Sequence, residues 1–187
     1  MPPKVKTTKD AIVSTAMEIV RTQGEQALNA RAVAAVLGCS TQPIFSNFAT
    51  MEDLRTAVIW EANALCNEYI RREVEAGEHP PYKASGLAYI RFAKEEKELF
   101  KMLYMRDRSE EDNSADSARD RSMEQLVQKN TGLDDEEVQL FHLEMWAYVH
   151  GIATMFATGF LDPEWELVSR MLTDAYQGMR KQYGTED

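Results

Sequence analysis

The sequence predicts an all-α protein of about nine helices. Apolar residues recur every three or four positions along most of the chain, whereas runs with the two-residue alternation of β-strands are missing. The 187 residues, of which 44% are hydrophobic, are enough to bury a sizeable core without disulfides. Glycines, prolines and residues that cap helix N-termini divide the chain into segments of helical length.

Three short helices are expected within the first 50 residues. Each follows a residue whose side chain can accept a hydrogen bond from the first turn, and the first two end at a glycine. The third contains a proline in its first turn, where a missing N–H is tolerated. The expected cap and stop residues are Thr8 and Gly24, then Asn29 and Gly38, and finally Ser40 for a helix over residues 41–47.

Longer helices are expected after residue 50. Thr50 and Asp53 form a capping-box pattern at the start of a helix that runs from Met51 to about Ala76, a length of about 40 Å. The paired prolines of GEHPPY (77–82) end it. Further helices are expected at about 83–97, 98–106, 118–130, 135–161 and 164–182, with a mobile acidic loop at 107–117.

Residues 145–161 carry no acidic or basic side chain if His150 is taken as neutral. A membrane span needs about 20 apolar residues, and this stretch is shorter and is flanked by Glu144 and Asp162. We therefore predict a buried core or interface helix and no membrane segment. Cys39 and Cys66 form no CxxC pair, and the N-terminus lacks the apolar core of a signal peptide. A cytoplasmic protein is expected.

The charge of the chain is unevenly distributed. Residues 1–50 hold five cations and three acids, a net charge of +2. Since the net charge of the whole chain is −10, the remaining residues carry a net charge of −12. A mildly basic head on an acidic body suggests two tasks in one chain. We predict a head domain over residues 1–50 and a second domain over residues 51–187.

Residues 29–48 (NARAVAAVLGCSTQPIFSNF) have the spacing of a helix-turn-helix. Ala34 lets the second helix approach, Gly38 suits a turn that needs a positive φ, and Ile44 anchors the second helix from beneath. An ordinary helical hairpin with a solvated face would show the same spacing. The residues left pointing outward are polar, none is acidic, and they suit the major groove of DNA: Thr41, Gln42, Ser46 and Asn47.

The first 55 residues resemble the DNA-binding domain of the TetR/AcrR family of bacterial transcriptional regulators. The matching pattern is Ile12, Ala16, Gly24, Leu28, Val33, Ala34, Gly38, Cys39, Ser40, Ile44, Phe45, Phe48 and Leu54. In the second half, residues 98–103 (ELFKML) with Trp146, Val149, His150 and Gly151 resemble the ligand-binding region of a subgroup named for a Trp-His-Gly signature. The resemblance implies a homodimer that binds an operator in double-stranded DNA and a small-molecule effector, with no cofactor and no enzymatic activity.

The amide of Gln42 is the first choice for reading a base, since it can pair with N6 and N7 of adenine, and Asn47 is the second. The family usually has a tyrosine at Phe45 and a lysine at Met51, both against phosphate. Their replacement predicts weaker DNA binding that depends less on salt. The full set of predicted DNA-binding residues is Lys6, Lys9, Arg31, Ser40, Thr41, Gln42, Pro43, Phe45, Ser46 and Asn47.

Aromatic and methionine side chains are dense in the second part of the chain, and such side chains can line an adaptable apolar pocket or simply fill a core. His142 and His150 have no third ligand at metal-binding spacing, so no metal site is predicted. The acidic composition hints at a cationic effector, although most of the acids are expected in solvent. The candidate pocket residues are Trp60, Tyr89, Phe92, Phe100, Met102, Tyr104, Met123, Met145, Trp146 and His150.

Two stripes on the last two helices are candidates for a dimer interface. Small residues on the eighth helix would let a partner helix come close, and the ninth helix has an apolar stripe. Two such helices from each chain would form a four-helix interface around a two-fold axis, although the same stripes could serve the monomer core. The candidates are Gly151, Thr154, Thr158, Val168, Leu172, Ala175 and Met179.

The expected mechanism is that of a ligand-released repressor. A small molecule between the fourth and eighth helices would tilt the fourth helix and lower operator affinity by typically about 1–3 kcal/mol. Two other classes of protein remain open. One is a helical carrier or enzyme without DNA affinity, and the other is an activator or adaptor that acts through residues 107–117.

Overall fold

The structure, a computed structural model, describes residues 7–107 and 114–184, and the side chains within these ranges except those of residues 114–120. In these ranges the chain forms nine α-helices and one short 3-10 helix, with no β-strand. The predicted all-α fold of about nine helices is therefore confirmed.

The chain divides into two compact units. The first unit comprises residues 1–67 and 96–106, and the second comprises residues 68–95 and 107–187. Helix α4 (Met51–Ala76) contributes residues to both. The division expected at residue 50 is a functional one and stays a prediction.

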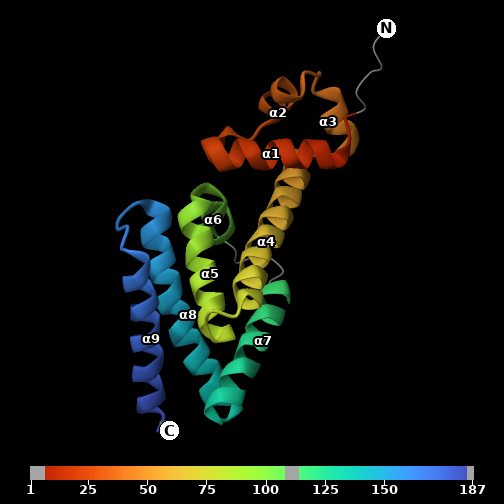
Figure 1. The fold of residues 1–187 in the computed structure, drawn as a ribbon. Helices are drawn as coiled ribbons and strands as arrows, with labels where there is room; N and C mark the ends of the chain where they lie inside the picture. Colours follow the sequence, from red (N-terminus) through yellow and green to blue (C-terminus); the bar gives the residue numbers. More distant parts are fainter. Residues whose placement is uncertain (1–6, 108–113, 185–187) are drawn as a thin grey trace. The chain divides into compact units, whose positions relative to one another are not determined.

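The first unit contains α1 (Lys9–Gln23), the 3-10 helix η1 (Glu25–Ala27), α2 (Ala30–Leu37), α3 (Gln42–Asn47), most of α4 and α6 (Lys97–Tyr104). Figure 1 shows α2 and α3 side by side on one face of α1, which both of them contact. The core beneath them contains Ile12, Ile44, Leu54 and Phe100, each with no exposed surface.

The helix ends of the first unit follow from local sequence. Thr8 Oγ1 accepts a hydrogen bond from the backbone N–H of Ala11 at 3.2 Å, and Asn29 Oδ1 accepts one from Ala32 at 3.0 Å. Gly38 ends α2 in the left-handed conformation, with φ +64°. These three predicted boundaries are confirmed.

Helix α3 begins one residue later than predicted. Its N-cap is Thr41, whose carbonyl oxygen accepts hydrogen bonds from the N–H groups of Ile44 at 3.1 Å and Phe45 at 3.2 Å. No side chain caps this end of the helix, so the prediction that Ser40 caps it was wrong. Thr41 already has helical dihedral angles, and Pro43 has no N–H to satisfy in the first turn.

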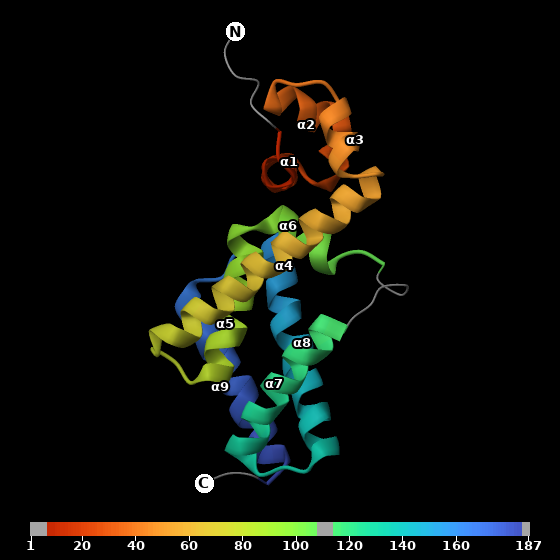
Figure 2. The same ribbon diagram turned by 90° about the vertical axis from the view of Figure 1, so that its right-hand side faces the viewer.

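The second unit contains the end of α4, α5 (Pro81–Glu95), α7 (Ser114–Thr131), α8 (Asp135–Thr158) and α9 (Trp165–Gln182). Helix α8 contacts α5, α7 and α9, and α5 also contacts α7 and α9. Figure 2 shows the tight turn between α7 and α8, after which the chain reverses direction.

Several boundaries in the second unit differ from the predictions, and three of the differences have a clear place in the local structure. Helix α5 begins at Pro81 instead of Lys83, because the first helical position tolerates proline. Helix α8 ends at Thr158 instead of 161, because Gly159 adopts a φ of +70° and its N–H bonds to Phe156. Of the loop predicted at 107–117, residues 108–113 lie outside the described residues, and residues 114–117 are helical instead.

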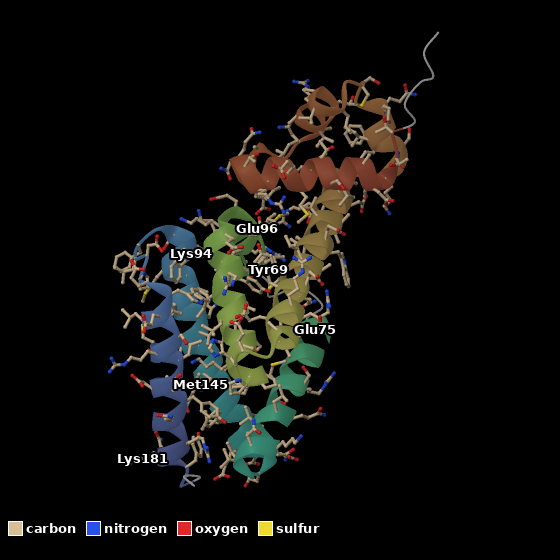
Figure 3. All side chains as sticks on the ribbon, viewed as in Figure 1. Tyr69, Glu75, Lys94, Glu96, Met145 and Lys181 are labelled. Atoms are coloured by element: carbon tan, nitrogen blue, oxygen red, sulfur yellow. The ribbon has the colours of Figure 1, made fainter. Side chains whose placement is uncertain are left out.

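The uncharged stretch at 145–161 contributes to the core of the second unit, as predicted. Met145, Val149, Ile152 and Phe156 are buried at 9% exposure or less. Figure 3 labels Met145 on α8. Within the described ranges, every helix falls short of the length or hydropathy that crossing a bilayer demands.

Candidate functional site

The turn between α2 and α3 has the geometry of a helix-turn-helix. The N–H of Gly38 donates to Ala35 O at 3.3 Å, and the N–H of Cys39 donates to Ala34 O at 3.0 Å, which closes the end of α2. Ala34 is 4% exposed and Ile44 is fully buried, so the two helices pack through the positions expected from their spacing.

The outer face of α3 is exposed and uncharged. Gln42, Ser46 and Asn47 are exposed, and Phe45 is 49% exposed. Ser46 Oγ donates to Gln42 O at 2.9 Å and Asn47 Nδ2 donates to Pro43 O at 2.8 Å, so both side chains are held against the helix backbone. Among the described hydrogen bonds, none involves the side-chain amide of Gln42, so this amide differs from that of Asn47.

The surroundings of this face are weakly basic. Residues 26–51 contain no acid and one cation, Arg31, which is exposed. Lys9 lies with its Nζ 5.2 Å from the centre of the Phe48 ring. The guanidinium of Arg55 pairs with Glu25 and, at 3.1 Å, with Glu52, so its charge is locally compensated.

The remaining predicted DNA-binding residues are distributed around the same turn. Ser40 is exposed, and Thr41 and Pro43 are half-buried. Lys6 lies outside the described residues.

Cys39 is half-buried in the turn, whereas Cys66 is buried and accepts a hydrogen bond from the Tyr104 hydroxyl at 3.7 Å.

The second unit contains a cavity of about 330 Å³ between α4, α5, α7, α8 and α9. Four of the predicted pocket residues line it, namely Tyr89, Met123, Met145 and Trp146. Most of the lining was not predicted as pocket; it comprises Ile70, Pro80, Tyr82, Lys83, Ser85, Gly86, Asn130, His142, Val149, Leu172, Thr173, Tyr176, Gln177 and Arg180.

The other predicted pocket residues do not line this cavity. Phe92 is fully buried in the core of the second unit. Trp60 is 67% exposed and belongs to the first unit. Phe100, Met102 and Tyr104 also belong to the first unit, where the first two are buried. His150 lies behind the lining, where it stacks on Trp146 with ring centres 4.8 Å apart.

Two tyrosine–histidine pairs join α5 to α8. The hydroxyl of Tyr82 lies 2.9 Å from Nδ1 of His142, and that of Tyr89 lies 3.0 Å from Nδ1 of His150. Burial raises the pKa of Tyr82 and lowers the pKa of His150. The two tyrosines are seven positions apart and the two histidines eight, which places each pair of residues on one face of its helix. That repeated spacing was a signal in the sequence.

The polar edge of the cavity is positively charged. Lys83 Nζ donates a hydrogen bond to Thr173 Oγ1 at 2.9 Å, and Arg180 lines the cavity from the same helix as Thr173. Among the described residues that line the cavity, none is acidic. The hint of a cationic effector in the acidic composition finds no counterpart in this lining.

The predicted dimer residues on α8 and α9 lie in different environments. On α8, Gly151 and Thr154 are half-buried and Thr158 is exposed. On α9, Val168 and Leu172 are 0% and 3% exposed, so they are buried within the chain itself. Ala175 and Met179 pack against the core cluster around Phe141. Large exposed apolar side chains lie on and after α8 instead, at Leu140, Leu143, Tyr148, Phe160, Leu161 and Leu167.

Comparison with solved structures shows the same fold in a TetR-like transcriptional regulator from Rhodococcus sp. RHA1. The TM-score is 0.71 at 17% sequence identity, and the match covers 96% of this chain and 98% of that chain. No curated protein matches the sequence.

Residues 82–175 match a family model described as the tetracyclin repressor-like C-terminal domain. This range covers half of the chain and contains Trp146, His150 and Gly151, which carried the resemblance in the second half. The chain therefore belongs to the TetR family of transcriptional regulators.

Proposed function

We propose that the protein is a homodimeric repressor that binds a pseudo-palindromic operator and leaves it when a small molecule binds. Residues 1–50 bind DNA, and residues 51–187 bind the effector and the second chain. The observation that carries the proposal is the turn at Gly38, with φ +64°, between α2 and an α3 whose outer face is exposed, polar and free of acids. The membership of the TetR family supports it.

The DNA contacts divide into two classes. Gln42 and Asn47 carry the side chains that read base edges, because a paired amide donor and acceptor match the major-groove edge of adenine. Lys9 and Arg31 are exposed cations suited to phosphates, which position the protein without reading sequence. The face has few cations, which supports modest affinity with a shallow dependence on salt.

The second chain is needed because a single helix of six residues reads few bases. Recognition helices in a dimer enter successive major grooves when they lie about 34–36 Å apart. The partly exposed stripe of small residues on α8, comprising Ala147, Gly151, Thr154 and Thr158, supports close packing against the same stripe of a second chain.

Effector binding is coupled to DNA binding through α4. Ile70 of this helix lines the cavity, and Leu54 of the same helix is buried in the core of the first unit. A ligand that favours one position of α4 changes the relative stability of the DNA-binding state. Coupling of about 1–3 kcal/mol, which is 5- to 150-fold in affinity, is typical of such switches.

The test is selection of duplexes from a random DNA library by the purified protein, followed by fluorescence anisotropy with the selected duplex. The proposal expects an enriched pseudo-palindrome and binding by two chains. The Gln42→Ala/Asn47→Ala double variant should lose this binding, and a control with the exposed Gln125 and Gln139 both changed to alanine should keep it. Enrichment of no sequence overturns the proposal.

A carrier or enzyme without DNA affinity is the second candidate. It is favoured by the single cation in residues 26–51 and by the internal pairing of Arg55. This candidate expects no enriched duplex and ligand binding that is indifferent to DNA. An activator would bind the selected duplex and raise, instead of lower, expression of a reporter gene placed behind it.

A further inference from the structure

We infer that the cavity of the second unit takes an apolar organic anion, a compound with a hydrophobic body of one or two rings and a carboxylate or sulfonate group. This inference rests on the proposed function only in treating the cavity as the effector site. The class of ligand is argued from the chemistry of the lining.

The body of the ligand is set by the apolar part of the lining. Ile70, Met123, Met145, Val149 and Leu172 present only aliphatic or thioether surface. Trp146 adds a large ring to the same lining. A cavity of about 330 Å³ matches the smaller end of the range for small-molecule sites, which are mostly apolar with a few placed polar groups. Methionines also let such a wall adapt to the shape of a bound ring.

The charge of the ligand is set by what the lining contains and what it lacks. Lys83 and Arg180 are the cations among the described lining residues, and no carboxylate is among them. This contrasts with a chain whose net charge is −10. A cation in a partly enclosed apolar site is attracted to an anion more strongly than the same pair in water, because the effective dielectric is lower. The charged side chains of the described lining repel a cationic ligand.

The neighbouring polar groups support the same assignment. Burial disfavours the charged form of both Tyr82 and His150, which lowers the pKa of the imidazole and raises that of the phenol. Tyr82 also lines the cavity, so its neutral hydroxyl supplies a hydrogen-bonding group without a negative charge. Neither group therefore adds a negative charge to the described lining near neutral pH.

The two cations lie at different places along the cavity. Lys83 is bonded to Thr173, and Arg180 lies seven residues further along α9, which is about 10 Å of helix. A single carboxylate or sulfonate therefore contacts one of them, and its apolar body extends toward the other. Substituting each cation separately shows which end holds the anionic group.

The experiment uses two fluorescent probes that differ by one charged group. Anilinonaphthalene sulfonate is the anion, and phenylnaphthylamine has the same rings without the sulfonate. Titration of the full-length protein is expected to give binding of the sulfonate at least about 10-fold tighter than binding of the neutral amine, which corresponds to about 1.4 kcal/mol. Equal or tighter binding of the amine, or no binding of either probe, overturns the inference.

Charge-removing variants test the role of the cations. One of the two variants Lys83→Gln and Arg180→Gln, the one that removes the cation in contact with the sulfonate, should weaken binding of the sulfonate at least about 10-fold. Both variants should leave binding of the amine within about two-fold of the native value. The matched control is Lys181→Gln, which removes the same charge one residue beyond Arg180 at an exposed position outside the lining (Figure 3). Unchanged sulfonate affinity in both cavity variants overturns the inference.

Binding of the selected operator duplex is measured in parallel for each variant. If the native protein binds no operator duplex, the proposed function is refuted, and the probe titrations still test the class of ligand. Retained operator binding with no charge preference in the cavity would refute the ligand class alone. The two failures are therefore distinguishable.

Discussion

The hydroxyl of Tyr89 lies 3.0 Å from Nδ1 of His150, and the indole of Trp146 stacks on the same imidazole with an interplanar angle of 11°. Tyr89 is 6% exposed. The imidazole of His150 therefore contacts a buried phenol on one side and the indole of Trp146 on another. This environment favours a neutral ring, and burial lowers the pKa of His150.

This pair predicts a loss of stability in mild acid. The unfolded chain binds a proton at His150 with a pKa of about 6.5, whereas the folded chain binds it only at lower pH. The contribution of the neutral imidazole to the free energy of unfolding is fully present above pH about 6.5 and is lost as the pH falls below that value. Urea unfolding measures the fall in the free energy of unfolding between pH 7.5 and pH 5.5. This fall should be smaller in His150→Asn than in the native protein. The variant His79→Asn, in the loop between α4 and α5, controls for removal of an imidazole; equal losses in all three proteins would contradict the prediction.

The hydrogen bonds on α3 predict unequal effects of its two amides on DNA binding. Gln42→Ala should weaken binding to the selected duplex by about 1–3 kcal/mol, the range for a bidentate contact to a base. Asn47→Ala should cost less, because the Asn47 amide already donates to Pro43 O at 2.8 Å. Anisotropy titrations at a fixed salt concentration measure both. The reverse order would show that Asn47 turns outward to read a base.

The left-handed conformation of Gly38 predicts a stability cost for any side chain at that position. Gly38→Ala should lower the free energy of unfolding by about 1 kcal/mol, although no atom lies within 4 Å of the added Cβ. Gly178→Ala is the matched control, because Gly178 lies within α9 with equally open space around its Cβ. That substitution should raise the free energy of unfolding by about 0.5–1 kcal/mol. Urea denaturation of both variants tests the contrast, which fails if the two changes have the same sign.

The stripe of small residues on α8 predicts that a large charged side chain at Gly151 separates the proposed dimer. A Cβ at this glycine meets no atom within 4 Å, so Gly151→Arg should leave the fold of the chain intact. Light scattering after gel filtration should give the mass of one chain instead of two. Gln139→Arg, at an exposed position on a different face of α8, should remain dimeric. A dimeric Gly151→Arg variant would place the interface elsewhere.

The helix boundaries of the first unit were predictable because they depend on neighbouring residues. Thr8, Asn29 and Gly38 each act within four positions of the helix end that they define. The prediction of a Ser40 cap was wrong because Thr41 adopts helical dihedral angles one residue before α3. In this unit the predicted helix ends lie within about one or two residues of the observed ones.

The lining of the cavity was less predictable because it depends on how five helices pack. Phe92 and Tyr89 lie three positions apart on α5, yet Phe92 is buried in the core and Tyr89 lines the cavity. The composition of the chain predicted aromatic and methionine residues in the pocket, but not Lys83 and Arg180. Sequence alone does not distinguish a cation at the surface from a cation that lines a cavity. Their positions relative to Thr173 follow only from tertiary structure.

Of the chain's two cysteines, Cys66 is buried and Cys39, in the turn that precedes α3, is half-buried. A maleimide dye added to the native, folded protein is therefore expected to attach beside α3, without any engineering of the chain. Labelling kinetics then give a direct footprint of whatever covers this turn, whether nucleic acid or another macromolecule.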